Sequence, residues 1–336
     1  MNIRPNRAAV LCCLGLFGAS SLPIDSSVDD RGGILAAVVK PLRMLQREAM
    51  AQDAVTPSHV YQATSDLISE IEILRDAMGV TVYPVEAEAQ DDRAPIHTYA
   101  KSLEVLEKIS AAQRRLGMTP ARIRQIPVKE IGPKDVYNSV QINLAEVRKM
   151  KTQLVIEDEI QPAPLEGGKT PSVVYQLLGD ASFLLDGLVG HPIDPNDVHT
   201  HLVYLHDEME LIATKLKVAL ELEPPAVSGR KRMKDVAQQV LRATFKVINL
   251  QTRLGMDASG VPQLTLVRVS PAEVYEATNI LLAEMVRIKA HLGIDLPRVE
   301  HAPSRNKKPR DAFSQTLLLI RNLDSLARAA DSYVAS

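Results

Sequence analysis

The sequence of 336 residues contains no tryptophan, four phenylalanines and only two cysteines. The two cysteines, Cys12 and Cys13, lie side by side near the amino terminus, inside a short apolar stretch. Once that stretch is removed, the mature chain has no thiol, which excludes disulfides, zinc–thiolate sites, iron–sulfur clusters and a cysteine nucleophile. A chain without thiols suits an oxidising compartment such as the periplasm or the extracellular space.

The sequence also lacks an excess of charge of one sign, with a formal net charge of −2. A nucleic-acid partner is therefore not expected, because phosphate neutralisation needs a clustered surplus of lysine and arginine. The longest basic clusters, "SGRKRMK" (228–234) and "SRNKKPR" (304–310), each precede a predicted helix and are interpreted as solvated connecting segments, with a phosphate site as the alternative. The hydrophobic content of 46% is that of a folded soluble protein.

Sequence motifs of enzymes are missing as well. The chain has no G-x-S-x-G, no glycine-rich phosphate loop, no C-x-x-C-H haem site and no H-E-x-x-H. We therefore predict a protein that is not an enzyme and has no cofactor. A hydrolase whose residues are dispersed along the chain is the alternative.

The amino terminus has the pattern of an export signal. Arg4 and Arg7 precede the apolar run "AAVLCCLGLFGA" (8–19), which ends in small residues. Residues 1–21 are predicted to be a signal peptide, with an uncleaved anchor as the alternative, and no later stretch is expected to cross a membrane. Residues 22–55 are predicted to form an extension with one degenerate helix. The predicted location is periplasmic or secreted.

The rest of the chain is an internal repeat. Units begin at even spacing at Thr56, Ala94, Gly132 and Thr170, and again at Asp194, Arg232, Ser270 and Lys308. The second set repeats the first at a constant displacement, so that Asp194 is the counterpart of Thr56 and "QTRLGM" (251–256) is the counterpart of "QRRLGM" (113–118). The pattern predicts a duplicated block, with the first copy at 56–193 and the second at 194–331.

Each unit is predicted to be one helix of about 22 to 24 residues. Seven of the eight units have proline at the first helical position, where its missing N–H costs nothing. Residues such as Thr56, Thr170, Asp194 and Ser270 precede these prolines as N-caps. Four units end in glycine followed by an apolar residue, at Gly79, Gly117, Gly255 and Gly293, which is the Schellman stop signal.

Apolar residues within each unit follow alternating steps of four and three, which is typical of helices in a bundle. The fold class is therefore all-α, with two tandem four-helix bundles. Most connecting segments are about 14 residues long, and an extended segment of that length spans roughly 45 Å. Such a segment can retrace a helix of about 33–36 Å, so we predict parallel helices within each block. Antiparallel helices joined by loose loops are the alternative.

One unit position on the edge of the apolar stripe alternates in charge. It carries Glu70, Glu146, Glu208 and Glu284 in four units and Lys108 and Lys246 in two others. Paired carboxylates in a bundle can bind two metal ions, but that chemistry uses Glu-x-x-His pairs, which this sequence lacks. We interpret the six residues as structural ion pairs that fix the order of the helices.

A histidine-rich stretch, "DVHTHLVYLHDEMEL" (197–211), gives the metal hypothesis. His199, His206 and Glu210 recur at helical spacing, and two imidazoles with a carboxylate could bind zinc, copper or nickel. The alternative interpretation is a partly exposed helix edge without metal.

Tyrosines recur one turn inside several helices. In a parallel bundle Tyr61, Tyr99, Tyr137, Tyr175 and Tyr275 could gather at one end and bind an apolar or cationic ligand. Alternatively, these side chains are structural and close the end of the bundle.

Taken together, the sequence predicts an exported, non-enzymatic binding, adaptor or sensor-like protein of the cell envelope. Its expected partner is another envelope protein, which could bind along the free backbone edges of the connecting segments. The alternative is a periplasmic bundle protein that binds a small molecule or metal.

Overall fold

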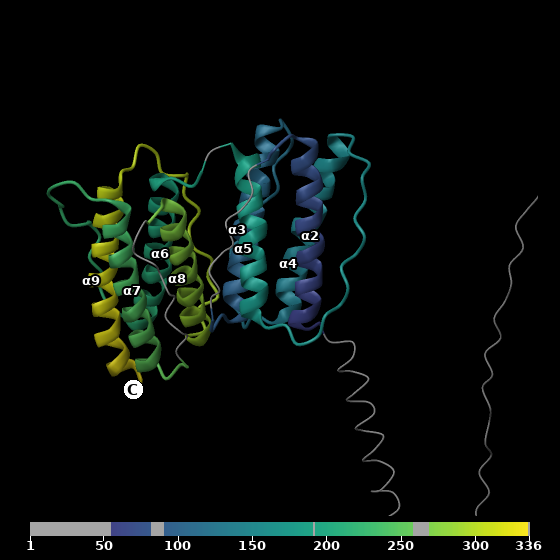
Figure 1. The fold of residues 1–336 in the computed structure, drawn as a ribbon. Helices are drawn as coiled ribbons and strands as arrows, with labels where there is room; N and C mark the ends of the chain where they lie inside the picture. Colours follow the sequence, from purple (N-terminus) through teal and green to yellow (C-terminus); the bar gives the residue numbers. More distant parts are fainter. Residues whose placement is uncertain (1–54, 82–90, 191, 258–268, 335–336) are drawn as a thin grey trace, which may run out of the picture. The chain divides into compact units, whose positions relative to one another are not determined.

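The computed structural model describes residues 55–81, 91–190, 192–257 and 269–334. Within these ranges the chain is all-α, with eight helices and no strand, as the sequence predicts. The helices are α2 (Pro57–Ala77), α3 (Pro95–Arg115), α4 (Pro133–Gln153), α5 (Pro171–Val189), α6 (Pro195–Leu216), α7 (Met233–Arg253), α8 (Pro271–His291) and α9 (Pro309–Val334) (Figure 1). The predicted signal peptide and degenerate helix lie outside the described residues.

The helix starts follow the predicted prolines, since seven of the eight helices begin with one. Thr170, Asp194 and Ser270 cap their helices through the side chain, as expected. A second hydrogen bond at the helix starts was not predicted from the sequence. In seven helices the side chain of the third helical residue accepts the N-cap N–H, as Asp135 does for Gly132 and His97 for Ala94. One otherwise unpaired backbone donor per helix is satisfied in this way.

The four predicted glycine stops are confirmed. Gly79, Gly117, Gly255 and Gly293 all have φ between +66° and +75°, and the next residue donates a hydrogen bond back across the turn. Helices α4 and α6 end in the same left-handed conformation at Val155 (φ +57°) and Lys217 (φ +55°), which the sequence analysis did not foresee. Neither side chain favours positive φ, so no sequence signal marked these two ends.

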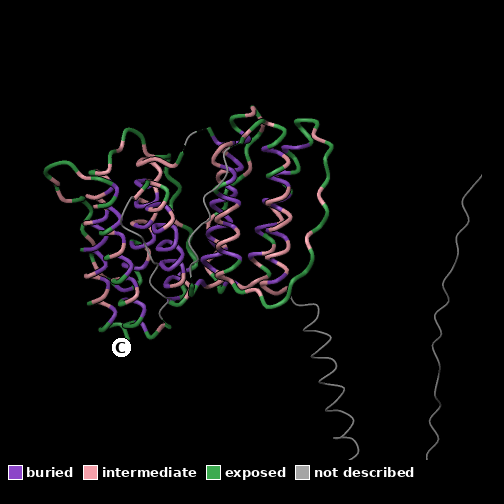
Figure 2. The backbone as a smooth tube through the Cα atoms, viewed as in Figure 1, coloured by how far each residue is buried: buried purple, intermediate pink, exposed green. Residues whose placement is uncertain are grey.

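The buried apolar residues form two hydrophobic clusters, one drawn from α2–α5 and one from α6–α9 (Figure 2). In the first cluster α2 and α3 each pack against α4 and α5, and in the second α6 and α7 each pack against α8 and α9. A further contact joins α3 to α8, and Ala283 and Val286 of α8 belong to the first cluster. The two groups of helices therefore meet through α3 and α8.

The first turns of α2, α3, α4 and α5 lie around one small cavity of about 10 Å³. Its lining consists of the first residue of each helix and the residue one turn later: Pro57, Val60, Pro95, Thr98, Pro133, Val136, Pro171 and Val174. The first turns of these four helices therefore lie close to one another.

Connecting segments lie along the helices. Gln62 of α2 donates to the carbonyl of Ala163 at 2.6 Å, and the Ala163 N–H donates to Asp66 at 2.7 Å. In the second group, Asn322 of α9 exchanges two hydrogen bonds of 2.9 Å with the backbone of Glu221. The segments are thus held against helix surfaces by side-chain hydrogen bonds to their backbone.

One helix departs from the expectation that no later stretch could cross a membrane. By length and composition alone, α5 is apolar enough to do so. In this structure α5 packs against α2 and α3, and its Leu178, Ala181 and Leu185 are in the first hydrophobic cluster. A buried core helix explains the same composition.

Candidate functional site

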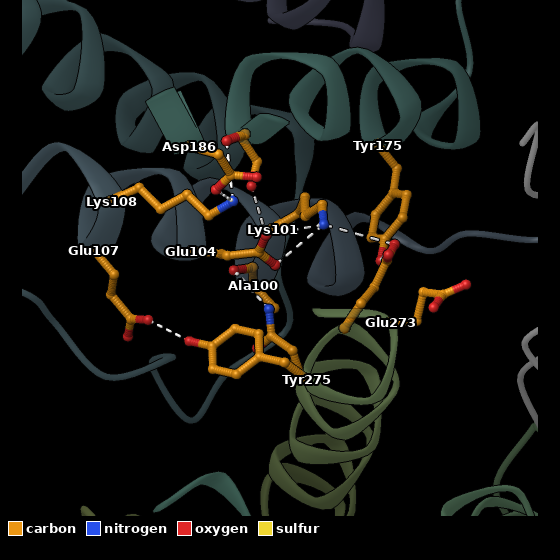
Figure 3. A network of polar contacts seen from close by, with 12 residues as sticks. Ala100, Lys101, Glu104, Glu107, Lys108, Tyr175, Asp186, Glu273 and Tyr275 are labelled. Carbon is orange, nitrogen blue, oxygen red and sulfur yellow. Dashed lines mark hydrogen bonds and ion pairs between the residues drawn. The ribbon is translucent and has the colours of Figure 1, made fainter. Parts of the chain in front are cut away.

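The contact between α3 and α8 is rich in charged and polar side chains (Figure 3). Lys101 and Glu104 of α3 are each only 5% exposed. Asn279 of α8 donates to the Ala100 carbonyl of α3 at 3.2 Å. Because burying a charge is costly unless it is paired, each charged group here needs a partner.

Lys101 is the central cation of this contact. Its ammonium lies 3.1 Å from Glu104 and 3.6 Å from Glu276 of α8, and Ser182 of α5 donates to Glu104 at 2.6 Å. Burial alone would lower the pKa of Lys101, but the two carboxylates raise it above its ordinary value. Burial likewise raises the pKa of Glu104, and the cations of Lys101 and Lys108 reverse that effect. Both groups are therefore charged at neutral pH.

Two tyrosine–carboxylate hydrogen bonds cross between the helix groups. Tyr175 of α5 donates to Glu276 at 2.8 Å, and Tyr275 of α8 donates to Glu107 of α3 at 2.5 Å. Burial, supported by the negative charge of Glu104, raises the pKa of Glu107 to about 7, although the Tyr275 hydrogen bond opposes this. Glu107 is thus a carboxyl group that changes protonation near neutrality.

Glu284 of α8 connects three helices. It accepts from His97 of α3 at 2.5 Å, from Arg287 at 2.7 Å and from Gln251 of α7. The Nδ1 atom of His97 accepts the Ala94 N–H at 3.0 Å, so the ring proton resides on Nε2 and is donated to Glu284. The N-cap of α3 therefore fixes the tautomer that binds α8.

A small cavity of about 30 Å³ lies beside these pairs, with room for about one water molecule. His201 of α6 lines it and stacks on Tyr275 with the ring centres 3.9 Å apart. Its buried Nδ1 atom has no hydrogen-bond partner in the described structure, and burial lowers the pKa of His201 to about 3. Gln125 and Arg298, from two connecting segments, exchange two hydrogen bonds of 3.1 Å at the rim.

The six residues predicted as ion pairs all make polar contacts between or along helices, but not with one another. The carboxylates of Glu70 and Glu208 pair with Lys151 and Lys289, at 2.5 and 2.6 Å. The remaining contacts are Lys108 with Asp186, Lys246 with Asp324, Glu146 with Gln113 and Lys149, and Glu284 as described above. The partners lie at other unit positions, which a single-position analysis could not identify.

Several of these contacts occur twice, between counterpart residues of the two blocks. The Lys151–Glu70 pair recurs as Lys289–Glu208. The pairs Lys108–Asp186 and Gln113–Glu146 recur as Lys246–Asp324 and Gln251–Glu284. The α3–α8 contact is made once. Its α3 residues His97, Lys101, Glu104 and Glu107 have different residues as counterparts, namely Asp235, Gln239, Arg242 and Phe245.

The predicted metal ligands are engaged elsewhere. His199 hydrogen-bonds to Ser304 at 2.9 Å, and burial together with Lys307 lowers the pKa of His199 to about 4. His206 donates to the Gln315 carbonyl at 3.2 Å, and Glu210 is exposed. The described residues contain no group of three or more histidine, cysteine, aspartate or glutamate side chains placed to hold a metal ion. Metal binding at this stretch stays a prediction, which zinc or copper calorimetry tests.

The five predicted ligand-binding tyrosines are placed differently from one another. Tyr175 and Tyr275 are buried and contact the opposite helix group, as described above. Tyr61 lies under the Lys169 ammonium at 4.0 Å, and Tyr99 and Tyr137 are partly buried. Among the described residues no ring contact joins two of these five tyrosines.

Sequence analysis missed the α3 side chains His97, Lys101, Glu104 and Glu107. They lie outside the apolar stripe and were not among the predicted site residues. The sequence of α8 does contain a signal for this contact, because "NILLAEMVRI" (279–288) is apolar on more than one face. A helix that is apolar nearly all round is buried on two sides, which predicts a second neighbour.

Comparison with protein-family models, with curated proteins and with solved structures finds no match to this chain.

Proposed function

We propose that the chain consists of two duplicated, parallel four-helix bundles, residues 56–193 and 194–331, docked through α3 and α8. The two hydrophobic clusters and the contacts repeated between counterpart residues support the duplication. The helix starts that meet around one cavity support the parallel order, as do connecting segments bound along helices. Spin labels at the starts of α2 and α4 test the order, because parallel helices place both labels at one end.

On this framework, the protein is an exported, non-enzymatic binding or adaptor protein of the cell envelope. The observation that carries the proposal is that its connecting segments are fixed to helices while large apolar side chains on them are exposed. Leu165, Leu222 and Leu296 are 53%, 76% and 57% exposed. Fixed, extended backbone with exposed apolar side chains is a surface on which a partner segment can pair.

The α3–α8 contact has a structural role in this proposal. Its buried charged groups have partners across the contact, as in Lys101 with Glu276 and Glu284 with the His97 N–H. Such buried pairs favour one docked arrangement over alternatives, because separating α3 from α8 would leave buried charged groups without their partners. The segments of both bundles are then presented to a partner in a constant geometry.

Affinity capture tests the proposal. The full chain, tagged at its carboxyl end, is used to recover proteins from an envelope fraction, and each captured protein is then used as bait in reverse. We expect one envelope protein to be recovered in both directions. Serine substitution of Leu165, Leu222 and Leu296 together is expected to abolish recovery, because it removes the exposed apolar side chains.

Phe245→Ser is the matched control, because Phe245 is also exposed, at 58%, but lies on a helix. This variant is expected to retain the partner. Failure to recover any specific envelope protein, or equal loss in the control, contradicts the proposal. Location is tested separately by fractionation, where recovery of the chain only in the cytoplasm contradicts export.

The alternative of a small-molecule carrier is less well supported. The cavities lined by core side chains are about 30 and 10 Å³, too small for a ligand carried inside a bundle, and the larger concavities of about 400–590 Å³ lie at the described surface. A thermal-shift screen with metals, haem and metabolites tests this alternative, and a reproducible rise in the unfolding temperature would favour it.

A further inference from the structure

Two basic segments far apart in the sequence meet at one surface. Residues 229–232 precede α7, and residues 308–310 begin at the N-cap of α9. They line one concavity of about 590 Å³, formed by Gly229, Arg230, Lys231, Arg232, Lys308, Pro309 and Arg310. We call these residues the basic concavity. Five of the seven are cationic.

None of the five cations has an anionic partner in the part of the chain that the structure describes. The closest acidic residues along the chain are Asp235 and Asp311, which accept the N-cap N–H of Arg232 and Lys308, at 2.8 Å each. Their carboxylates are thus engaged with backbone. Lys231 lies over the Phe313 ring at 4.7 Å, a contact that leaves its charge unneutralised.

The fold itself does not require these cations. Their counterparts in the first block are Asp92, Arg93, Ala94, Thr170 and Ser172, so only one is cationic. Arg93 is buried over the Tyr175 ring, which corresponds to Lys231 over Phe313. The first block therefore keeps the ring contact and builds the same helix starts without the other four cations.

Five like charges around one concavity repel each other, and a bound anion relieves that repulsion. The starts of α7 and α9 add the positive ends of two helix dipoles. Guanidinium groups such as those of Arg230 and Arg310 bind phosphate oxygens in pairs, with geometry that a carboxylate shares but a halide does not.

The concavity is open to solvent and, at about 590 Å³, has room for a small anion. Its lining contains no large apolar side chain that could anchor a protein partner or insert into a lipid layer. We propose that the basic concavity is a binding site for a small anion that carries two or more phosphate groups. This inference is independent of the function proposed above, because no connecting-segment leucine takes part.

Calorimetric titration of the full chain with tripolyphosphate, pyrophosphate and sulfate at low salt tests the proposal. We expect saturable binding of about one anion per chain, with tripolyphosphate tighter than pyrophosphate and sulfate weakest, because the site has five cations. Affinity is expected to fall steeply with added salt. The Arg230→Ala/Arg310→Ala variant is expected to bind tripolyphosphate at least about tenfold more weakly.

Lys134→Ala/Arg242→Ala is the matched control. It removes the same charge from two exposed helix positions outside the concavity and is expected to bind within about twofold of the original chain. Circular dichroism and urea midpoints establish that both variants fold. The proposal is overturned by the absence of saturable binding at millimolar tripolyphosphate, or by equal weakening in the control. Tighter binding to anionic vesicles or to an acidic peptide than to tripolyphosphate overturns it as well.

Discussion

The Nε2 atom of His97 lies 2.5 Å from the Oε1 atom of Glu284 and joins α3 to α8. Burial of Glu284 on its own would raise the pKa of that carboxyl group. Burial is the largest single effect, but His97, Arg287 and Gln251 together outweigh it and lower the pKa of Glu284 to about 2 from its ordinary 4.5. The carboxylate is therefore stabilised in its charged form by contacts that exist only in the folded chain.

This pairing predicts a loss of stability in acid. Because the folded pKa is depressed, Glu284 contributes its stabilisation fully above about pH 4.5 and loses it as the pH falls toward 2. The contribution is about 3 kcal/mol in the free energy of unfolding. Glu284→Gln is expected to lose about this amount at pH 7 and to match the original chain near pH 2, as measured by urea unfolding.

Glu146→Gln is the control, since Glu146 is the counterpart of Glu284 in the first block and its side chain is 23% exposed. We expect it to lose less than about 1 kcal/mol at pH 7. A pH profile in which both substitutions behave alike would contradict the special role of the His97–Glu284 pair.

Glu107 is expected to make the chain less stable as the pH rises through neutrality, which is opposite in sign to the effect of Glu284. Burial raises the pKa of Glu107 to about 7. A carboxyl group with a raised folded pKa gives stability that is present below about pH 4.5 and lost as the pH rises through 7. The facing groups are Glu104 on α3, Asp197 on α6, Tyr275 on α8 and Arg298 on a connecting segment.

Glu107→Gln keeps a hydrogen-bond acceptor for Tyr275 but has no charge to bury. We expect it to be more stable than the original chain by about 1–3 kcal/mol at pH 8 and similar near pH 5. Urea unfolding at both pH values measures the difference. Glu72→Gln, at an exposed position of α2, is expected to change neither value. A loss of stability at pH 8 would show that the charged carboxylate is the favoured form.

Most of the helical layout could be predicted from the sequence because its signals are local. Proline at the first helical position and glycine at the stop each determine the backbone of one or two residues. The end of α4 at Val155 escaped detection because a β-branched residue is disfavoured at positive φ and so gives no stop signal in the sequence. The signal peptide and the degenerate helix lie outside the described residues and stay predictions.

The α3–α8 contact could not be predicted because it depends on which outer faces of two helices meet. Because they occupy the same repeat position, Glu284 and Glu146 were given the same expected role. In the structure Glu284 binds His97 from the other helix group, whereas Glu146 is partly exposed. Val286 illustrates the difference. Its counterpart Arg148 lies at the surface and pairs with Glu70, whereas Val286 packs into the first hydrophobic cluster. Counterpart residues that differ in this way could identify the docking face only once the α3–α8 contact was known.

The two blocks also differ around a buried lysine, so we expect substitution of Lys289 and of its counterpart Lys151 to cost different amounts of stability. Lys289 is 1% exposed and bonds to Glu208 and to the Leu296 carbonyl, at 2.6 Å each. Burial raises the pKa of Glu208, and Lys289 only partly offsets this. In the first block Lys151 and Arg148 together lower the pKa of Glu70 despite its burial. Glu208 therefore has one cation in direct contact, Lys289, with Arg298 acting from farther away, whereas Glu70 has two in direct contact.

Lys289→Met is expected to cost about 3–5 kcal/mol at pH 7, because it leaves Glu208 as an unpaired buried charge. Lys151→Met is expected to cost at least about 1 kcal/mol less, since Arg148 still pairs with Glu70 at 2.8 Å. Urea unfolding measures both values. Adding Arg148→Met to Lys151→Met is expected to bring the first block close to the cost seen for Lys289→Met, and equal costs for the two single variants would contradict this account.

The end of α4 offers a stabilising substitution. Val155 has φ +57° and is 79% exposed, so its side chain gains little from packing while its backbone is in the left-handed region. That conformation costs an L-residue with a branched side chain about 1–2 kcal/mol, and glycine avoids the cost. The counterpart of Val155 in the second block is Gly293, with φ +66° and the same hydrogen bond back across the turn.

Val155→Gly is therefore expected to raise the free energy of unfolding by about 0.5–1 kcal/mol, because relief of the backbone strain exceeds the extra flexibility of glycine in the unfolded chain. Gly293→Val is the reciprocal control and is expected to lower it by about 1–2 kcal/mol. Urea unfolding at pH 7 measures both. Val155→Gly and Gly293→Val exchange the same two residues at equivalent turns, so a destabilised Val155→Gly chain would mean that this helix end does not adopt the left-handed stop.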